Sequence, residues 1–544
     1  MSNRLHYDKN GIKYLLESGF WLINFITYAI CAIPLLLHIM LHNLSTNLFH
    51  SKVNQNAFIN FVYVIEYWFE GSVVMKVPDL LVAGDRKKVD IKEKILDLNI
   101  KPIYKGKKYF LRTYGCQMNV HDSEEIKYYL EALGYEAVDE LERADIVVLN
   151  TCAIRENAKD KVFGYLGRCK HLKKENPNLI IAIAGCLMQQ PKEIEEIHNR
   201  HQYIDIIIGT HNLSELPSLI EEANNKKKQN IEVYSNSDVV FENVKYNRDS
   251  KISAWINIIY GCDKFCTYCI VPYTRGRERS RKMEEVLEEV KSLKEQGYME
   301  ITLLGQNVNA YGKDLNLGYD FATLLENVAK IGIPRIRFVT SHPWNFTDRM
   351  VDVIAQYDNI MPYVHLPIQS GSDEILKRMN RKYTVEEYKK LFDQIKEKVK
   401  NVAITTDIIV GFPNETDEDF QKTLDIVNYC KFDGAYTFIF SPREGTAAAK
   451  MVDKVPLQVK EERLQKLNEL VNKYSLESNK KLLGKVVDVL IIGKSEKDDS
   501  KVYGYTDTMK LVNVIGDSNL IGKIVSVKIT DAKSFSLDGE YSQG

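Results

Sequence analysis

The sequence predicts an α/β protein with three structural parts: a parallel α/β domain, a central incomplete barrel of six strand-and-helix units, and a small C-terminal β-barrel. Near-continuous apolar segments alternate with helix-like segments from Lys107 to about residue 440, which is typical of parallel sheets covered on both faces. After Gly484 the segments become short and strand-like, with Gly, Asp and Asn between them. A chain of 544 residues is also too long for one ordinary core.

Residues 1–75 form an apolar extension ahead of this pattern. The segment 20–41 contains no Asp, Glu, Lys or Arg, and its length suffices to span a bilayer. Pro34 and several polar residues inside the segment weaken that interpretation. We expect an extension of unknown role on a cytoplasmic protein, with a membrane anchor at residues 20–41 as the alternative. A chain that starts at Met75 is expected to be soluble and active.

Charge and cysteine content narrow the classes of function. The chain has 73 basic and 74 acidic residues, so any contact with RNA must come from a local patch rather than from net charge. Nine cysteines without a plausible disulfide framework favour a reducing compartment and metal or catalytic roles.

Three strand-like segments of the first domain, expected over residues 107–224, are each followed by a Cys. The pairs are Tyr109–Tyr114 with Cys116, Asp145–Leu149 with Cys152, and Leu179–Ala184 with Cys186. Parallel strands present their sites at their carboxyl ends, so these thiols should meet at one edge of the sheet. The sequence therefore predicts a cluster held by three thiolates. Residues 222–250, rich in Lys, Asn and Ser, read as a linker after this domain.

A second set of thiols, Cys262, Cys266 and Cys269, follows the short apolar run 255–259 and Gly261. No Cys follows within the next hundred residues, so three thiolates leave one metal position open. An iron–sulfur cluster with one iron free to bind a small molecule fits this count. The alternative is a helical face of three small apolar residues, which Gly261 and the β-branched and aromatic residues in the loop disfavour.

The central barrel is expected over residues 248–478. Its predicted strands are 255–259, 300–304, 335–340, 363–367, 403–410 and 436–440. Functional residues of such barrels follow the strands. The residues after these strands that we select as candidates for a binding pocket are Gln306, Asn307, Ser341, His342, Gln369 and Gly411. Each alone could serve a turn or a structural hydrogen bond; their shared position at strand ends favours a site.

A basic run follows the second set of thiols: Arg275, Arg277, Arg279 and Arg281. The planar guanidinium suits phosphate, so we expect contacts with RNA. Pairing with carboxylates of the helix-like segment 284–289 is the alternative. At the C terminus, residues 481–544 contain strand-like segments at 486–492, 502–506, 510–514 and 523–529. They predict a small β-barrel that binds RNA or caps the central barrel.

Several motifs resemble one known family. The spacing Cys-x-x-x-Cys-x-x-Cys is that of radical S-adenosylmethionine (SAM) enzymes, and residues 270–281 resemble their methylthiotransferase branch. The stretches 113–119, 150–157 and 184–189 resemble the N-terminal domain of that branch, 303–312 resembles its tRNA-modifying members, and the C-terminal part resembles a TRAM domain. The resemblance covers the chain from about residue 107 to its end.

This resemblance implies two [4Fe–4S] clusters. Cys262, Cys266 and Cys269 would hold the cluster whose open iron binds SAM and whose electron cleaves it to methionine and a 5′-deoxyadenosyl radical. Cys116, Cys152 and Cys186 would hold an auxiliary cluster that carries the sulfur. The loops after the barrel strands would line the SAM pocket.

The activity implied is that of a tRNA methylthiotransferase that converts N6-isopentenyl (dimethylallyl) adenosine at position 37 to its 2-methylthio derivative. One SAM would donate the methyl group and one would supply the radical. The expected partners are tRNA with isopentenylated adenosine and an electron donor such as flavodoxin or ferredoxin; the sulfur donor stays open, and a monomer is expected. The alternatives are a sister methylthiotransferase acting on threonylcarbamoyl adenosine or a ribosomal-protein aspartate, and a non-catalytic zinc-bearing RNA-binding protein.

Overall fold

The computed structural model describes residues 76–79, 83–84, 92–95, 99–153, 156–226, 229–235, 239–242, 244–496 and 498–542. All of them lie in one compact unit, Val74–Gly544. The expectations for residues 1–75, including an anchor at 20–41, lie outside this part of the chain. Within it, no helix combines the length and the apolar character needed to cross a membrane.

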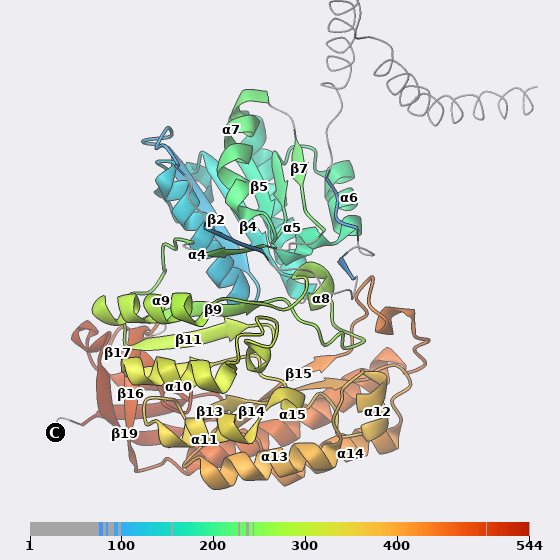
Figure 1. The fold of residues 1–544 in the computed structure, drawn as a ribbon, viewed down its shortest axis with the longest axis vertical. Coiled ribbons are helices and arrows are strands. Elements are labelled where there is room, and N and C mark those ends of the chain that lie inside the picture. The colour runs from blue at the N-terminus through green and yellow to red at the C-terminus, as the bar shows by residue number, and fades with distance from the viewer. Residues whose placement is uncertain are drawn as a thin grey trace, which may run out of the picture. The chain divides into compact units, whose positions relative to one another are not determined.

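The first domain is a parallel sheet with helices on both faces (Figure 1). Its strands, in the order β3-β2-β4-β5-β6-β7, are β2 (Lys108–Tyr114), β3 (Glu136–Ala137), β4 (Ile146–Thr151), β5 (Ile180–Ala184), β6 (Ile206–Ile208) and β7 (Asn230–Glu232). The helices α4 (Gln117–Ala132) and α7 (Leu216–Lys226) cover one face, and α5 (Glu156–Glu175) and α6 (Pro191–Arg200) cover the other. This arrangement confirms the predicted parallel α/β domain.

Strand β4 shows why the sequence pattern led to this architecture. All of its residues are buried. Ile146 and Val148 pack into the core beneath α4, whereas Val147 and Leu149 pack on the side of α5. Successive side chains of a strand point to opposite faces, so an uninterrupted apolar run requires cover on both.

The stretch 222–250 is not the simple linker that the sequence predicts. Strand β7 extends the first sheet beside β6, and β8 (Val239–Glu242) pairs in parallel with β1 (Lys92–Ile95). Within β7 only Ile231 is apolar, and it is buried between Asn230 and Glu232. One apolar residue carries too little periodic signal to predict a strand.

The central region contains two parallel sheets. The first joins β9 (Ser253–Tyr260), β11 (Glu300–Gly305) and β12 (Arg335–Phe338), with the short antiparallel β10 (Arg279–Ser280) beside β9. The second joins β13 (Tyr363–His365), β14 (Ala403–Val410) and β15 (Gly434–Ile439). Backbone bonds of 2.8 Å from Ile336 N–H to Asn359 O and from Met361 N–H to Ile336 O link the two sheets.

Helices pack against the outer faces of both sheets (Figure 1). Their bounds are α9 (Met283–Glu295), α10 (Phe321–Ile331), α11 (Asp348–Gln356), α12 (Asp373–Arg378), α13 (Val385–Lys398) and α14 (Asp417–Cys430). The short α8 (Val271–Thr274) lies instead against η2 of the first domain. Short 3-10 turns that follow strands bear on the site; they are η2 (Cys186–Gln189), η4 (Val308–Ala310) and η5 (Pro343–Asn345).

The C-terminal part is a closed barrel, as predicted. Its strands, in the order β16-β17-β18-β20-β19, are β16 (Val486–Lys494), β17 (Lys501–Thr506), β18 (Leu511–Ile515), β19 (Ile524–Ala532) and β20 (Leu537–Tyr541). Strand β20 is not among the predicted strands, because Asp538, Gly539 and Glu540 give its segment the composition of a loop.

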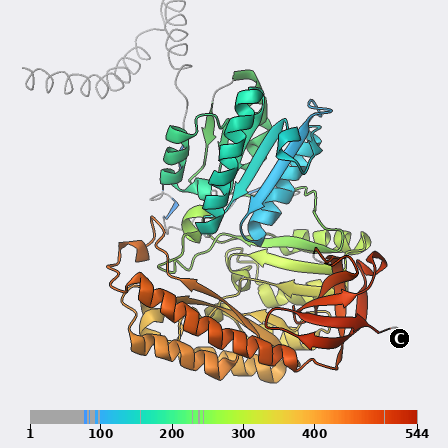
Figure 2. The same ribbon diagram turned by 180° about the vertical axis from the view of Figure 1, so that it is seen from behind.

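Two sets of contacts hold this barrel against the central region. The long helix α15 (Leu457–Lys480), the orange-red helix of Figure 2, leads into it, and Asn479 Nδ2 donates to Lys533 O at 2.7 Å. From β12, the Arg335 guanidinium donates to Tyr505 O at 2.7 Å and to Asp488 O at 2.9 Å.

Candidate active site

Three thiols lie at the carboxyl ends of neighbouring strands of the first sheet. Cys116 caps the start of α4 after β2, Cys152 follows β4, and Cys186 opens η2 after β5. The strands are in register, with Tyr114 opposite Thr151 and Asn150 opposite Ala184. The structure thus places these thiols side by side, as the spacing predicts, while their role as cluster ligands stays a prediction.

Glycine precedes two of these thiols for a steric reason. Gly185 has a φ of 102°, and a Cβ there would lie 2.3 Å from Asn150 Oδ1 and 2.4 Å from Thr151 O. A Cβ on Gly115 would lie 2.9 Å from the Cβ of Cys152. The backbone can bring the thiols this close only where no side chain intervenes.

The buried side-chain amides of Asn119 and Asn150 lie next to this first set of thiols. Asn119 Nδ2 donates to Asn150 Oδ1 and to Thr151 O, each at 3.3 Å, and lies 4.0 Å from Cys186 Sγ. Asn150 Nδ2 donates to Asn119 O at 2.8 Å. N–H groups aimed at sulfur are the contacts by which proteins tune iron–sulfur clusters.

The first set of thiols differs in acidity. A hydrogen bond with Cys152 and the charge of Arg275 lower the pKa of Cys116 to about 6 against the effect of burial. Burial raises the pKa of Cys186 to about 11, although Arg275 acts in the opposite direction. At neutral pH Cys116 is therefore mostly in the thiolate form, which is the form that binds metals.

The second set, Cys262, Cys266 and Cys269, lies in a tight loop after β9. No helix forms between residues 262 and 269, so the helical alternative is wrong. The Cys269 N–H donates to Cys266 O at 2.9 Å, and the Cys262 N–H donates to Gly276 O at 3.1 Å. Burial raises the pKa of Cys262 well above its usual value and that of Cys269 to about 12.

Arg381, just after α12, supports this loop. Its guanidinium donates to Cys266 Sγ at 3.4 Å, to Pro367 O at 3.0 Å and to the Tyr383 hydroxyl at 2.9 Å. The ring of Tyr383 in turn meets the ring of His342 edge-on at 5.9 Å. A cation, two aromatic rings and the thiol thus adjoin one another at the strand ends.

Four of the selected pocket candidates lie close to this loop. Gln306 accepts from the Gly261 N–H, and Asn307 donates to Glu278 at 3.0 Å. Ser341 donates to the backbone oxygen of His365. Among these four candidates, the buried polar atoms without a hydrogen-bond partner in the described structure are Gln306 Nε2, Asn307 Oδ1 and both ring nitrogens of His342. Such atoms are the groups that a polar ligand satisfies on binding.

The other two candidates have structural contacts. Gln369 has a φ of 72° and donates its N–H to Asp407 O at 2.9 Å. Gly411 has a φ of 68° and donates to Glu415 at 2.7 Å, and a Cβ there would clash with Lys460. Their contact with SAM stays a prediction.

The arginines after the second thiol loop have partners within the protein. Arg275 is only 6% exposed; it donates to Cys186 Sγ at 3.1 Å and to both carboxylate oxygens of Asp122 at 3.0 and 2.5 Å. Arg277 pairs with Asp263 at 2.6 Å. Arg281 pairs with Glu289 at 2.7 Å, the helix carboxylate of the alternative interpretation. Arg279 is buried over the ring of Tyr260. Contact of these residues with RNA stays a prediction.

Arg275 also marks a junction between the two thiol sets. Ile270 and Tyr273, just after Cys269, pack against Ala153 and Cys186 of the first domain. Thr210 donates to Thr274 O at 2.8 Å. Asp122 and Arg381 were not predicted as site residues, because each lies in a helical or loop segment without a recognisable motif. Both act on thiols that are distant in sequence.

Within the described residues, no group of three His, Cys, Asp or Glu side chains is arranged to hold a single metal ion. A [4Fe–4S] cluster makes a different demand, because each thiolate binds a different iron atom. Both thiol sets consist of soft sulfur donors, with N–H donors from Asn119, Arg275 or Arg381 beside them. These donor sets fit iron–sulfur clusters.

Comparison with known proteins identifies the family. The Radical SAM superfamily matches residues 256–427, the uncharacterized protein family UPF0004 matches 108–209, and the TRAM domain matches 480–541. The tRNA-2-methylthio-N(6)-dimethylallyladenosine synthase of Staphylococcus epidermidis is 51% identical, over 86% of this chain and 92% of that protein. The chain belongs to this synthase family.

Other members agree with this assignment. The synthase of Bacillus subtilis is 54% identical over 80% of this chain and 86% of its own length, and that of Oceanobacillus iheyensis is 51% identical over 88% and 92%. As a member of the synthase family, the chain is a radical SAM methylthiotransferase with a C-terminal TRAM domain. Among solved structures, the radical SAM methyltransferase TsrM of Kitasatospora setae is 14% identical, with a TM-score of 0.46 over 63% of this chain and 74% of that chain.

Proposed function

We propose that this enzyme converts N6-isopentenyl adenosine at position 37 of tRNA, beside the anticodon, to its 2-methylthio derivative. The names of its relatives support the substrate. The observation that carries the chemistry is the pair of thiol sets, each at strand ends and joined through the contact of Arg275 with Cys186. One site for SAM and one for sulfur are what a methylthio transfer requires.

The barrel residues have the task of binding and orienting SAM. Cys262, Cys266 and Cys269 would hold a [4Fe–4S] cluster there, which would supply the electron for reductive cleavage of SAM. Gln306, Asn307 and His342 follow strands of the central region and have buried polar atoms without a hydrogen-bond partner, which are available to SAM. A radical is needed because no side chain can remove the aromatic C2 hydrogen of adenine as a proton at neutral pH.

The first domain has the task of holding sulfur. Cys116, Cys152 and Cys186 would hold an auxiliary [4Fe–4S] cluster, which would supply the sulfur for the transfer. Asn119 and Arg275 donate N–H groups toward Cys186 and keep the thiols in place. Burial of Cys152 and Cys186 keeps water from this set.

The remaining parts position the RNA and the partners. The two central sheets, linked through Ile336, support one incomplete (βα)6 barrel over residues 248–478, between the first domain at 107–224 and the TRAM domain at 481–544. The TRAM domain contacts tRNA. The expected partner is an electron donor such as flavodoxin or ferredoxin, and the enzyme acts as a monomer.

Mass spectrometry of tRNA nucleosides tests this function. A strain that lacks the chain should accumulate isopentenyl adenosine and lose its 2-methylthio form, and the restored chain should return it. In vitro, the anaerobically reconstituted enzyme with SAM, a reductant and isopentenylated tRNA should form the product. Methylthio transfer to threonylcarbamoyl adenosine or to a ribosomal protein instead would refute the proposal.

A further inference from the structure

The sheet β13-β14-β15 has one face that helices cover and one face that they leave open. On β14 the buried residues Ile404, Thr406 and Ile408 alternate with the partly exposed Thr405, Asp407 and Ile409. Ile404 and Ile408 belong to the core beneath the helices. Thr405, Asp407 and Ile409 therefore point to the opposite face of the sheet, away from these helices.

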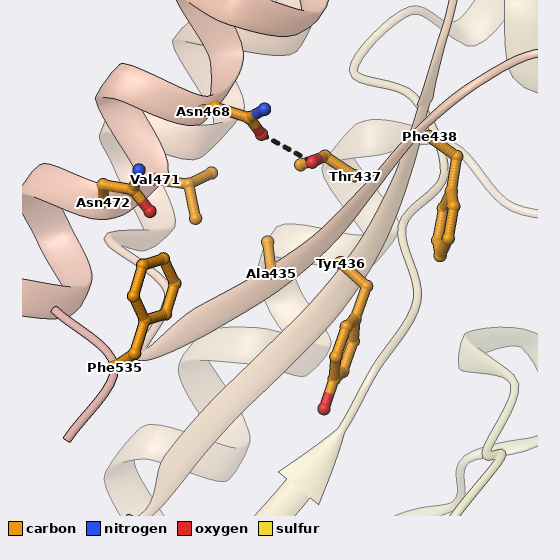
Figure 3. Close-up of a pocket in the computed structure, with 8 residues that line it drawn as sticks. All are labelled: Ala435, Tyr436, Thr437, Phe438, Asn468, Val471, Asn472 and Phe535. Carbon is orange, nitrogen blue, oxygen red and sulfur yellow. Dashed lines mark hydrogen bonds between the residues drawn. The ribbon is translucent and has the colours of Figure 1, made fainter.

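Strand β15 adds two aromatic side chains to the open face. Tyr436 pairs in register with Asp407, and Phe438 pairs with Ile409, so these side chains share that face. Tyr436 is 61% exposed and Phe438 is 50% exposed. In Figure 3 both rings point away from α15, whereas Thr437 points toward α15 and bonds Asn468. Large aromatic side chains left exposed next to one another mark a surface that binds something.

A polar pair borders these rings. His365 Nε2 lies 3.3 Å from Asp407 Oδ2, and His365 Nδ1 lies 2.9 Å from Thr405 Oγ1. The His365 and Tyr436 rings meet edge to face at 5.9 Å. We call His365, Asp407, Tyr436 and Phe438 the aromatic face.

The aromatic face is continuous with the radical site. Ser341 donates to the backbone oxygen of His365, and the next residue, His342, packs against Tyr383. Tyr383 bonds Arg381, which donates to Cys266 Sγ at 3.4 Å. A ligand on the aromatic face would therefore be connected to Cys266 through this short series of side-chain contacts.

We propose that the aromatic face binds the N6-substituted adenine base of the tRNA substrate. This inference rests on the proposed function and names the subsite for its reacting base. An enzyme that acts on a base must take it out of the stack, and aromatic side chains then replace the lost stacking. Tyr436 and Phe438 offer ring surface to the base and to its apolar isopentenyl group, and Asp407 can accept the N6–H.

Charge gives the aromatic face a selectivity. Near it, Arg337 already pairs with Glu300 at 3.1 Å and lies over the ring of Trp255. An N6 substituent bound on the aromatic face would therefore lie next to the negatively charged carboxylate of Asp407. An apolar isopentenyl group is accepted, whereas the carboxylate of a threonylcarbamoyl group meets like charge.

The test compares three anticodon stem-loops that carry isopentenyl adenosine, unmodified adenosine or threonylcarbamoyl adenosine. Their affinities for the reconstituted holoenzyme are measured by fluorescence anisotropy. Tyr436→Ala and Phe438→Ala should each weaken binding of the isopentenyl loop roughly tenfold. They should also reduce its preference over the unmodified loop. Tyr436→Phe should keep the wild-type preference, because the ring remains.

Phe535→Ala is the matched control. Phe535 is a more exposed aromatic residue, at 78%, on the α15 side of the strand in Figure 3, and its loss should change nothing. Asp407→Asn should raise affinity for the threonylcarbamoyl loop several-fold.

Two results overturn the inference in distinguishable ways. If the wild type modifies the isopentenyl loop while both alanine variants keep its full preference, the subsite is wrong and the proposed function stands. If the wild type binds the loops equally and modifies none, the proposed function fails and the subsite fails with it.

Discussion

The Nε–H of Arg275 donates to Cys186 Sγ over 3.1 Å. Arg275 belongs to the segment that follows Cys269 in the barrel, whereas Cys186 belongs to the first domain. One side chain thus ties the loop of one thiol set to a thiol of the other. The guanidinium is held in this position by both oxygens of Asp122. The two thiol sets are therefore in physical contact through Arg275.

Removal of one ligand from each thiol set should separate their tasks. Cys266→Ala should abolish SAM cleavage and all product, because the barrel cluster loses a ligand. Cys152→Ala should keep cleavage to 5′-deoxyadenosine but transfer no methylthio group. Cys430→Ala is the control, since Cys430 is buried in α14 away from both sets. Chromatographic assay of 5′-deoxyadenosine and of tRNA nucleosides measures both outcomes. Methylthio transfer by Cys152→Ala would contradict the division of labour.

Replacement of Arg275 should change the properties of the auxiliary cluster. Arg275→Met removes an N–H donor from Cys186 and should lower the reduction potential of that cluster, because hydrogen bonds to sulfur favour the reduced state. It also leaves Asp122 buried without its partner, at a cost of about 3 to 5 kcal/mol in the free energy of unfolding. A redox titration followed by electron paramagnetic resonance measures the potential, with the barrel cluster as internal reference.

Two further variants sharpen this prediction. Arg275→Lys keeps the positive charge but not the planar guanidinium. It should therefore recover the stability lost in Arg275→Met, but only part of the reduction potential of the wild type. Arg349→Gln, which breaks an exposed ion pair on α11, should change neither quantity. An unaltered potential in Arg275→Met with both clusters present would show that the contact with Cys186 has no electronic effect.

Addition of a single methyl group at Gly185 should disable the first thiol set. Gly185→Ala places a Cβ against Asn150 and Thr151 at a positive φ, so η2 must shift and carry Cys186 with it. We expect loss of roughly half of the bound iron and of methylthio transfer, with SAM cleavage retained. Gly167→Ala on α5, where nothing lies within 4 Å, is the control and should stabilise the helix by about 0.5 to 1 kcal/mol. Full iron content in Gly185→Ala would refute the steric account.

A salt titration of tRNA binding decides the role of the basic run. Among these arginines, Arg277 is more accessible than the buried Arg275, Arg279 and Arg281. If it contacts a phosphate, Arg277→Gln should weaken binding and reduce the slope of log K against log salt by about one. Fluorescence anisotropy at several ionic strengths measures the slope. The same slope in the variant and the wild type would assign Arg277 to its pair with Asp263.

Features that depend on the local sequence of one strand could be predicted, whereas contacts between residues of different domains could not. The apolar run of β4 and the Cys that follows each of β2, β4 and β5 are local patterns, so the parallel sheet and the meeting of its thiols could be predicted. The short β7, with one apolar residue, and β20, with Gly539 at its centre, are fixed by their neighbours and lack such a pattern.

The basic run shows the same limit within the site. Four alternating arginines resemble a phosphate-binding patch, but Arg275 and Arg281 are buried against Asp122 and Glu289. A carboxylate more than one hundred residues away in sequence decides the environment of Arg275. Spacing alone contains no information about such a partner.

The contact between Arg335 and the C-terminal barrel has a consequence for how the family can vary. Both acceptors, Tyr505 O and Asp488 O, are main-chain oxygens. Every amino acid offers the same carbonyl, so substitutions at positions 488 and 505 leave the attachment intact as long as the strands keep their path. The donor has no such freedom, because only a guanidinium reaches both oxygens at once. Substitutions of Asp488 and Tyr505 should therefore preserve the contact between the two domains, whereas substitution of Arg335 should break it.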